Sequence, residues 1–328
     1  MSLKEEANRI ALEVNSMIEE TLKGRPTYLY DASSHMIKAG GKRLRPFMAL
    51  KFHSLYSGDE KEALPAAASL ELVHNFTLIH DDIMDRDDIR HGVSTVHKEF
   101  GEPLAILAGD VLFAKAFDLV IGCPALKMDF ERMNSAVKLL ADSLIVLCEG
   151  QAIDVMAASG EIYTEEQYYE IIQKKTSALF EASAVMGVLT GGGSMKDREE
   201  ARAFARDTGM AFQMVDDLLG VAGDAAITGK PVGGDLKEGK KTLPIVLAIE
   251  RSDEQQRKLL YEVWGNAVAK QEDVERAVSV LRNLGIDDEV RGLADRHVER
   301  AIDHLNSLPE HGRSWLVDLA HFMAGRKI

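Results

Sequence analysis

The chain of 328 residues is predicted to be all-α, a single large helical bundle in which residues 1–328 form one domain around a central active-site cavity. Three observations predict this class. Apolar residues recur at helical spacing almost everywhere, as in residues 136–148 and 164–189. Helix-start signals precede several of these runs. No segment shows the alternation of apolar and polar residues that is typical of a half-buried strand.

Glycine, proline and short polar residues mark the breaks between the expected helices, of which there should be about ten or more. These breaks fall at residues 24–26, 57–59, 101–103, 191–193 and 229–234. A hydroxyl residue followed three positions later by glutamine predicts helix starts at Thr164 with Gln167 and at Ser252 with Gln255. The segment Ala136–Val155 is apolar nearly all round, so it is expected to be central.

The bulk composition argues against several classes of function. A net charge of −14 disfavours a nucleic-acid partner, because phosphate binding needs lysine and arginine clustered on one face. No apolar run reaches about 18 residues and the first residues do not resemble a signal peptide, so no membrane span is expected. Two cysteines, Cys123 and Cys148, give no disulfide framework, which favours a cytoplasmic location.

The stretch HDDIMDRDDIRHG, residues 80–92, places five aspartates within eight positions. Asp81 and Asp85 share a helix face, and Asp82 stands roughly 100° round from them. Like charges at this spacing destabilise an isolated helix by roughly 0.2–0.5 kcal/mol per pair, and a bound cation reverses that cost. A solvated acidic face is the alternative, but the segment continues an apolar run. Oxygen ligands on a helix without a calcium-loop glycine favour Mg²⁺.

A second acidic motif, FQMVDDLLGVAGD, spans residues 212–224. Asp216 and Asp217 follow an apolar helical run, and Gln213 lies one turn before them. Gly220 occupies the position one turn after Asp216, so this motif offers fewer carboxylates on its face. Two aspartate pairs on separate helices are expected to face each other across a cavity, where they would bind Mg²⁺ ions together with a polyanion.

Two short basic motifs contrast with the acidic background. GGKRLRP, residues 40–46, gathers Lys42, Arg43 and Arg45 behind two glycines that allow close approach to a ligand. GKPVGGDLKEGKKTLP, residues 229–244, resembles a loop that closes over phosphate, although it lacks the Walker spacing for nucleotide binding. Ordinary surface lysines and arginines are the alternative interpretation of both motifs.

Taken in order, GGKRLRP, DDIMD, the pair Lys175–Thr176, FQMVDD and GKPVGGDLKEGKKT resemble the motifs of the trans-isoprenyl diphosphate synthases. The order and spacing match over residues 40–244, and five motifs in order are highly specific. The resemblance implies a bundle of the isoprenoid synthase type, usually a homodimer, with about three Mg²⁺ ions per site. It implies condensation of isopentenyl diphosphate with an allylic diphosphate (dimethylallyl, geranyl or farnesyl).

The resemblance also implies roles for individual residues. The metal ions would be bound by Asp81, Asp82, Asp85 and Asp216. The diphosphate of isopentenyl diphosphate would be bound by Lys42, Arg45 and His74. The allylic diphosphate would be bound by Arg90, Lys175, Lys230 and Lys240. Thr176 and Gln213 would lie beside the allylic carbon, where their oxygen dipoles favour developing positive charge.

Two residues depart from the usual pattern of that family. His91 follows Arg90 where a second arginine is usual, and a largely neutral imidazole predicts weaker or pH-dependent binding of isopentenyl diphosphate. Gly220 stands where many members carry a third aspartate, a variant that resembles the archaeal-type branch. Activity is therefore expected to survive the glycine.

Residues before Asp81 are expected to limit the length of the product. Phe76, five positions before, is bulky, and Thr77, four positions before, is small. An aromatic residue at the fifth position alone resembles the members that form twenty-carbon geranylgeranyl diphosphate. A farnesyl product, a mixture of both products, and a plain packing role for Phe76 stay open.

Three other functions compete with this interpretation. A terpene cyclase would share DDIMD and the helices, but it would leave GGKRLRP and His74 without a role. A phosphohydrolase with a His80–Asp81 metal pair would need further histidines that the sequence does not supply in an obvious pattern. A non-catalytic partner subunit of a heteromeric prenyltransferase would be expected to lose acidic or lysine motifs, and only His91 hints at such a loss.

Overall fold

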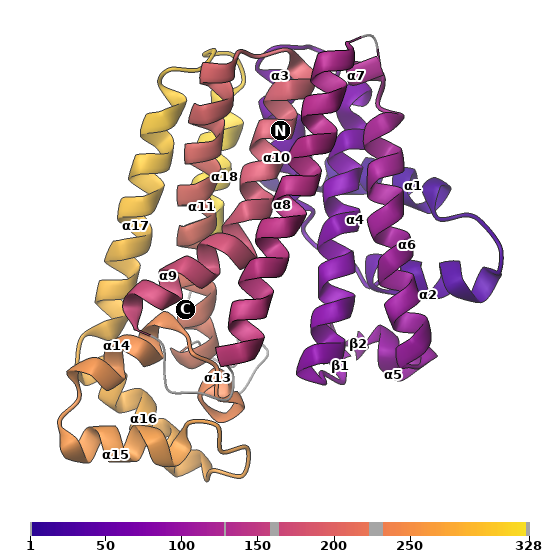
Figure 1. The fold of residues 1–328 in the computed structure, drawn as a ribbon. Coiled ribbons are helices and arrows are strands. Elements are labelled where there is room, and N and C mark those ends of the chain that lie inside the picture. The colour runs from indigo at the N-terminus through magenta and orange to yellow at the C-terminus, as the bar shows by residue number, and fades with distance from the viewer. Residues whose placement is uncertain (1, 128, 158–163, 223–231, 326–328) are drawn as a thin grey trace. The chain divides into compact units, whose positions relative to one another are not determined.

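The computed structural model describes residues 2–127, 129–157, 164–222 and 232–325. Within these residues every regular element is a helix except one short hairpin, which confirms the all-α prediction (Figure 1). The chain divides into two compact units. The first contains Met1–Val146, Ala178–Ala205 and His304–Leu319, and the second contains Leu147–Ser177, Arg206–Asp303 and Ala320–Ile328. The organisation of the whole chain as one domain stays a prediction.

The first unit is built from helices of very different lengths. Within the described residues it holds α1 (Leu3–Thr21), α2 (Thr27–Lys38), α3 (Leu44–Ser54), α4 (Glu60–Asp85), α5 (Val96–Phe100), α6 (Glu102–Ile121), α7 (Pro124–Lys127) and α10 (Ala178–Gly191). Other helices continue from one unit into the other, namely α8 (Phe130–Ala157), α11 (Met195–Ala222), α17 (Ile286–Leu305) and α18 (Arg313–Ala324). The predicted breaks at residues 24–26, 57–59, 101–103 and 191–193 are confirmed.

Glycine allows close helix packing around α3 and α4. A Cβ atom at Gly187 of α10 would lie 2.2 Å from the carbonyl oxygen of Ala49 in α3, so only glycine permits this approach. A Cβ atom at Gly109 of α6 would lie 2.3 Å from Nε2 of His80 in α4. The second contact lets α6 pack closely on the last turns of α4, the helix that ends in the first acidic motif.

A short hairpin follows α4 directly. Strands β1 (Ile89–Arg90) and β2 (Val93–Ser94) pair antiparallel, and His91 and Gly92 turn between them with φ of 51° and 79°. The sequence analysis did not predict these strands, because two residues are too few to show alternation. A two-residue turn with positive φ at both positions is nevertheless a typical hairpin signal, and glycine at its second position favours it.

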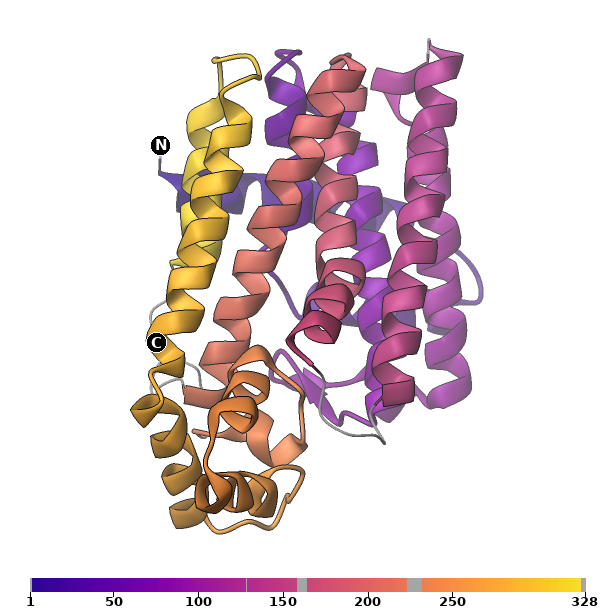
Figure 2. The same cartoon turned by 60° about the vertical axis from the view of Figure 1, so that its left-hand side comes forward.

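The second unit holds shorter helices besides its share of the long ones (Figure 2). Its described elements are α9 (Glu165–Ile172), a π-helical turn η1 (Gln173–Ser177), α13 (Gly234–Glu238), α14 (Leu243–Arg251), α15 (Glu254–Val263) and α16 (Gln271–Asn283). The predicted start at Thr164 is confirmed, since its hydroxyl and the Gln167 side chain each cap a backbone N–H. The break predicted at residues 229–234 falls partly outside the described residues.

The helix start predicted at Ser252 is wrong by one residue. Asp253 is the N-cap of α15, and its carboxylate accepts a hydrogen bond from Gln256 N at 2.8 Å. The hydroxyl of Ser252 instead donates to the carbonyl oxygen of Ala248 at 2.5 Å, at the end of α14. A carboxylate is at least as good an N-cap as a hydroxyl, so Asp253 replaces Ser252 in that role.

The long helix α8 was predicted to be central because its sequence is apolar nearly all round. One side of it is exposed, with Ile145 at 58 % and Met156 at 78 %. Cys148 is exposed too, whereas Cys123 is buried. Polar residues such as Glu149 and Asp142 share this helix, and the central place of its segment Ala136–Val155 stays a prediction.

Helix α6 carries an unusual share of apolar side chains at its surface. Ile106, Leu107 and Ile121 are 42 %, 52 % and 58 % exposed. No helix in the described ranges is both long enough and apolar enough to cross a membrane. The exposed apolar residues of α6 therefore need another explanation.

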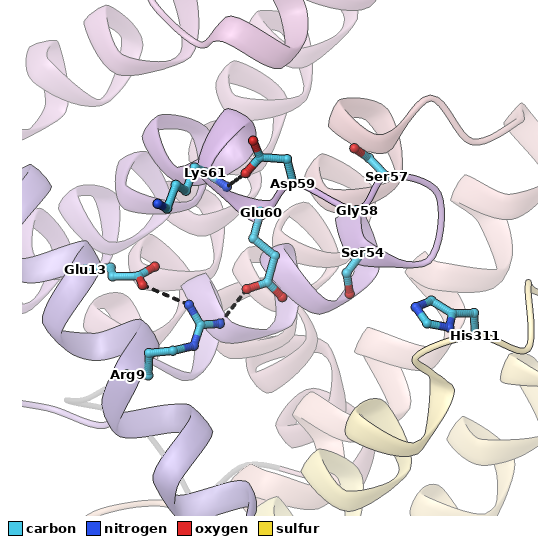
Figure 3. A pocket seen from close by; sticks show the side chains of 9 residues that line it. All are labelled: Arg9, Glu13, Ser54, Ser57, Gly58, Asp59, Glu60, Lys61 and His311. Atoms are coloured by element: carbon cyan, nitrogen blue, oxygen red, sulfur yellow. Dashed lines mark hydrogen bonds and ion pairs between the residues drawn. The ribbon is translucent and has the colours of Figure 1, made fainter. Parts of the chain in front are cut away.

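A polar cavity of about 310 Å³ opens at the beginning of α4 in the first unit (Figure 3). Its lining is mostly charged or hydroxylated and consists of Arg9, Glu13, Ser54, Ser57, Gly58, Asp59, Glu60, Lys61 and His311. The Arg9 guanidinium is already neutralised there by Glu13 and Glu60. The acidic motif occupies the other end of α4, roughly 30 Å away at about 1.5 Å per residue, so this cavity is separate from the predicted site.

Candidate active site

The first acidic motif forms the last turn of α4. Asp81 is half-buried and Asp85 is exposed, whereas the Asp82 side chain is completely buried. Asp82 Oδ1 accepts a hydrogen bond from Arg90 Nε at 2.5 Å, and Asp82 Oδ2 has no hydrogen-bond partner among the described residues. Asp81 and Asp85 share an accessible helix face, and the second aspartate of the motif is directed elsewhere.

The hairpin after α4 supplies the cation that this buried carboxylate needs. Burial raises the pKa of Asp82, and the Arg90 guanidinium opposes that rise. A buried carboxylate without a cation would be strongly destabilising, so the ion pair fixes both side chains. The hairpin with its turn at His91 and Gly92 therefore places Arg90 beside Asp82, on the buried side of the acidic motif.

The GGKRLRP loop contains one arginine that stabilises the loop itself. Arg43 has a left-handed φ of 48°, and its guanidinium donates to the carbonyl oxygens of Gly40 at 2.9 Å and Ile37 at 2.7 Å. It also pairs with Glu71 at 3.0 Å while almost fully buried. A Cβ atom at Gly41 would lie 2.4 Å from Arg43 Nη1, which explains one of the two glycines. Arg43 thus shapes the loop and leaves Lys42 exposed.

The other predicted cations of the first unit gather around His74. The Arg45 guanidinium lies 4.4 Å from the ring centroid of Phe180, and burial lowers the pKa of Arg45 to about 10. The pKa of His74 is well below its usual value because of burial and then the nearby charges of Arg45, Arg43, Arg90 and His91. Mutually repelling cations at one place predict a site for an anion.

His91 stands exposed at the tip of the hairpin, beside Arg90. Partial desolvation lowers the pKa of His91, and the charges of Arg90 and Arg43 lower it further. The imidazole is consequently neutral at pH 7 in the ligand-free protein. That His91 binds an anion less strongly than an arginine would stays a prediction.

The second acidic motif has the same division between its two aspartates. Asp216 is exposed on α11, and Asp217 is buried. Asp217 Oδ2 accepts a hydrogen bond from the Tyr168 hydroxyl at 2.7 Å, and Oδ1 accepts one from Gln213 Nε2 at 2.8 Å. Gln213 Oε1 in turn accepts a hydrogen bond from the Thr176 hydroxyl at 3.0 Å. The chain of hydrogen bonds brings together Gln213 and Thr176, as the resemblance implied.

The environment of Asp217 differs from that of Asp82 in its partners. Burial raises the pKa of Asp217 to about 7, and the hydrogen bonds from Tyr168 and Gln213 only partly oppose this. The negative charges of Asp216 and Asp235 raise it as well. Tyr168 was not identified from the sequence, because a buried tyrosine on the apolar face of an amphipathic helix is an ordinary core residue.

The π-helical turn η1 presents Lys175 and Thr176 at the point where α9 meets α10. A Cβ atom at Gly150 of α8 would lie 2.7 Å from Lys175 N, so this glycine admits the wider turn. Lys175 Nζ lies 2.8 Å from Asp154 Oδ2. Asp154 was missed from the sequence, although a carboxylate in an otherwise apolar helix is a recognisable signal.

Of the two lysines predicted to bind diphosphate in the glycine-rich loop, only Lys240 lies within the described residues. Lys240 Nζ lies 3.1 Å from Asp235 Oδ1 and 2.6 Å from Glu238 Oε2. Lys230, predicted to bind the allylic diphosphate, lies outside the described residues. Asp235 was not singled out from the sequence, yet it is buried and pairs with a predicted ligand-binding lysine.

Comparison with known proteins decides the family. The polyprenyl synthetase family model matches residues 26–281. The chain belongs to the polyprenyl synthetase family. A short chain isoprenyl diphosphate synthase of Methanocaldococcus jannaschii is 43 % identical over 268 residues, which cover 81 % of this chain and 80 % of that protein.

Two solved structures of geranylgeranyl pyrophosphate synthases share the fold of this polyprenyl synthetase. That from Pyrococcus horikoshii superposes with a TM-score of 0.94 at 36 % identity and covers 99 % of this chain and 98 % of its own. That from Corynebacterium glutamicum, in complex with isoprenyl diphosphate and magnesium, has a TM-score of 0.86 at 28 % identity, and both chains are fully covered. The predicted isoprenoid synthase fold and prenyltransferase class are confirmed.

In this polyprenyl synthetase the predicted chain-length residues lie on α4, one to two turns before Asp81. The Phe76 ring contacts the His80 ring at 4.8 Å and the Phe113 ring at 5.7 Å between centroids. Phe113 contacts Phe117 of the same helix at 5.3 Å. Thr77 is buried, and its hydroxyl donates to the carbonyl oxygen of His74 at 2.8 Å. Aromatic rings of α4 and α6 therefore pack together beside the small Thr77.

The acidic residues of the polyprenyl synthetase fit Mg²⁺ better than a metal that needs a complete protein cage. No group of three His, Cys, Asp or Glu side chains that could hold a metal occurs in the described part of the chain. Mg²⁺ usually takes one or two carboxylates and completes its shell with water and phosphate oxygens. Asp81 and Asp85 offer two accessible carboxylates one turn apart, which is the number that Mg²⁺ usually takes from a protein.

Proposed function

We propose that this polyprenyl synthetase is a Mg²⁺-dependent trans-prenyltransferase that condenses isopentenyl diphosphate with allylic diphosphates, with geranylgeranyl diphosphate as its main product. One observation carries the proposal. Asp81 and Asp85 present accessible carboxylates at the end of α4, and the hairpin that follows brings Arg90 and His91 to the cations around His74. A metal-binding motif and an anion site are thus adjacent in the same unit.

Metal binding is assigned to Asp81, Asp85 and Asp216, the more accessible aspartates of the two motifs. When bound, Mg²⁺ neutralises the charge that develops on the departing diphosphate, with about three ions in the site by family resemblance. Asp82 was predicted as a further ligand. Its burial and its ion pair with Arg90 favour a positioning role, in which it holds the arginine toward the substrate.

The reaction needs no nucleophilic side chain. Lys175 and Lys240, with Lys230 and Arg90, stabilise the allylic diphosphate as its carbon–oxygen bond breaks. The hydrogen-bonded Thr176 and Gln213 direct oxygen dipoles toward the resulting allylic cation. The isopentenyl double bond then attacks that cation, and the proton released in forming the new double bond passes to the departed diphosphate. Water must be kept out, because it would capture the cation.

Isopentenyl diphosphate is assigned to the cations of the first unit. Arg45 and His74 lie among the charges that repel one another there, and Lys42 and His91 are exposed beside them. A bound diphosphate relieves this repulsion and makes a charged His91 more favourable. His91 is therefore a weaker ligand at high pH than an arginine would be.

The product is proposed to be the twenty-carbon diphosphate because the aromatic group on α4 and α6 blocks a longer chain. The growing tail runs from the metal site along α4, where Thr77 leaves space and Phe76 is braced by Phe113. Solved structures with a similar fold include geranylgeranyl pyrophosphate synthases, which supports this length.

We also propose that the enzyme is a cytoplasmic homodimer. The exposed Ile106, Leu107 and Ile121 of α6 form an apolar surface that a second copy would cover. Light scattering coupled to size exclusion should report twice the monomer mass, and Leu107→Glu should reduce it to the monomer mass. A wild-type monomer would contradict the proposal.

A single assay tests the proposed activity. Purified protein is incubated with labelled isopentenyl diphosphate and dimethylallyl, geranyl or farnesyl diphosphate, with Mg²⁺ or with EDTA. We expect elongation with each primer, a twenty-carbon end product on chromatography, and no turnover in EDTA. A fifteen-carbon end product would revise the length only. Inert protein that activates a second, separately added prenyltransferase chain would identify a partner subunit, and cyclised hydrocarbon formed without isopentenyl diphosphate would identify a terpene cyclase.

A further inference from the structure

The N-terminal helix α1 lies outside the five motifs and outside the part of the chain that the family model matches. It spans Leu3–Thr21, whereas the family match begins at residue 26 and the first motif at residue 40. One polar side chain of this helix nevertheless contacts the GGKRLRP loop. Asn15 Oδ1 accepts a hydrogen bond from Arg43 Nε at 2.9 Å. This contact connects α1 to the loop that is proposed to bind isopentenyl diphosphate.

The two arginines of the GGKRLRP loop use their donors differently. All three guanidinium nitrogens of Arg43 donate to protein acceptors, which come from α1, from α4 and from the backbone of Ile37 and Gly40. Arg45 Nε is buried and has no hydrogen-bond partner among the described residues. A buried charged donor without a partner is costly, so an anionic ligand is the natural acceptor. Arg43 therefore serves the loop, whereas Arg45 is directed to a ligand.

Arg43 needs these contacts because its backbone conformation is unfavourable. Its φ of 48° is left-handed, and a residue with a side chain keeps such a φ only where surrounding contacts enforce it. Arg43 is also the N-cap of α3, so its backbone sets how α3 leaves the loop. Lys42 directly precedes it, and Arg45 follows in the first turn of α3. A change in the conformation of Arg43 would therefore move both predicted ligands of the diphosphate.

Helix α1 is anchored to its neighbours by contacts that do not involve the loop. Three of its apolar side chains are fully buried, namely Ile10, Val14 and Ile18. The buried Lys51 of α3 pairs with Glu6 of α1 and lies 2.7 Å from Glu60 Oε1 at the start of α4. Breaking a buried ion pair of this kind is strongly destabilising. Asn15 therefore projects from a helix whose position on α3 and α4 is fixed.

Arg43 lies close to the cations that are proposed to bind the anion. Burial and then nearby charges, that of Arg43 among them, lower the pKa of His74 and the pKa of His91. Glu71 Oε1 of α4 accepts a hydrogen bond from Arg43 Nη1 at 3.0 Å, as Asn15 of α1 does from Nε. The guanidinium is thus adjacent to the anion site, but α1 and α4 hold its donors.

We propose that α1 is part of the isopentenyl diphosphate site and that Asn15 is a positioning residue in it. By accepting from Arg43 Nε, Asn15 keeps the loop in the conformation in which Lys42 and Arg45 bind the same diphosphate. This inference rests on the proposed function, which assigns that substrate to Lys42 and Arg45. Asn15 supports binding without contacting the substrate, so its loss should raise one KM and spare kcat.

The test removes the acceptor of Asn15 and then restores it. Asn15→Leu keeps a similar size and suits a helix, and Asn15→Ala removes the acceptor with a smaller side chain. Each should raise the KM for isopentenyl diphosphate by about tenfold, because a hydrogen bond to a charged group is lost. The KM for farnesyl diphosphate and kcat should change less than about twofold. Asn15→Asp keeps an oxygen at the same place, so its KM for isopentenyl diphosphate should stay within about threefold of the wild type.

A matched control separates the contact with Arg43 from a general effect on α1. Ser16→Leu introduces the same side chain at the next, exposed position of the helix and should leave both KM values unchanged. Thermal melts followed by circular dichroism compare the stability of all variants. The inference is overturned if Asn15→Leu and Asn15→Ala keep the wild-type KM for isopentenyl diphosphate, if they raise both KM values alike, or if Asn15→Asp is as impaired as they are. Wild-type protein that does not elongate farnesyl diphosphate would overturn the proposed function, and this inference with it.

Discussion

The two aspartate pairs, Asp81–Asp82 on α4 and Asp216–Asp217 on α11, have the same sequence but different surroundings. In each pair the first aspartate is the more accessible and the second is buried. Asp82 is paired with a guanidinium, whereas Asp217 accepts hydrogen bonds from the neutral Tyr168 and from a glutamine. The same dipeptide therefore supports an arginine in one unit and an amide in the other.

The difference lies in how each buried carboxylate is stabilised. A cation partner favours the ionised form, and neutral donors leave burial as the stronger influence on the pKa. Asp217 consequently has a pKa of about 7, while the arginine opposes the rise at Asp82. We propose that the more accessible aspartates of the two pairs, Asp81 and Asp216, bind the metal.

The largest effect is expected from the first aspartate of each pair. Asp81→Asn and Asp216→Asn should each lower kcat by roughly 10²–10³-fold, because each removes charge that stabilises the departing diphosphate through the metal. Asp88→Asn is the matched control, since this neighbouring aspartate is 70 % exposed and pairs with Lys98. Steady-state kinetics with saturating Mg²⁺ measure the effect. Near-normal turnover of Asp81→Asn or Asp216→Asn would contradict the assignment of that aspartate.

Replacing the second aspartate of each pair should affect stability differently in the two units. Asp82→Asn leaves Arg90 without its buried partner, so we expect a loss of about 1–3 kcal/mol in the free energy of unfolding and a raised KM for the allylic diphosphate. The asparagine in the variant Asp217→Asn resembles a protonated aspartate. The variant should therefore lose less than about 1 kcal/mol in the free energy of unfolding at pH 7. Urea unfolding and initial-rate kinetics test both. Equal losses would show that the partners of the two carboxylates do not matter.

The pH dependence of stability should distinguish Asp217 from its counterpart. Its pKa of about 7 lies above that of an unfolded aspartate, so the folded protein holds a proton that the unfolded chain has lost. Stability from this group is present at low pH and falls as pH rises toward 7. Unfolding is measured in EDTA. Between about pH 5 and pH 7, the free energy of unfolding should fall by on the order of 2 kcal/mol more for the wild type than for Asp217→Asn. Parallel curves for the two proteins would refute the raised pKa.

A smaller effect is expected at His91, which follows the arginine of the Asp82–Arg90 ion pair. His91→Arg adds a permanent charge with two donors at the tip of the hairpin, so the KM for isopentenyl diphosphate should fall by about threefold to tenfold. The wild-type KM should also fall as pH drops through the lowered pKa of His91, because the bound diphosphate favours the charged ring. His91→Gln provides the uncharged control. An unchanged or higher KM for His91→Arg would exclude His91 from the anion site.

The smallest effect on rate, with a qualitative change in product, is expected from the α4 face that packs on α6. Phe76→Ala removes a ring that Phe113 braces, so products longer than twenty carbons should appear on chromatography while the initial rate changes less than about threefold. Ile79→Val, at a fully buried position roughly 160° round α4 from Asp81, should leave the product length unchanged. A product distribution that Phe76→Ala does not alter would remove Phe76 as the barrier.

Much of the candidate site was predictable because helical periodicity fixes which residues of one element lie together. The spacing of Asp81 and Asp85, and the order of the five motifs, indicated the class of chemistry before any contact was known. The partners that hold these residues were not predictable. Arg90 reaches Asp82 through a two-residue hairpin, and Asp154 reaches Lys175 from another helix. Neither contact leaves a periodic signal in the sequence.

The sequence alone determined that the protein is all-α and which carboxylates and cations are the candidates for its site, since short-range spacing and residue type decide both. Only the tertiary structure decided what each aspartate of a pair does, because burial and partner charge come from residues far away in the chain. It also decided why position 220 is glycine. The carboxylate of Asp235, which arrives from α13, already occupies the space that any side chain there would need.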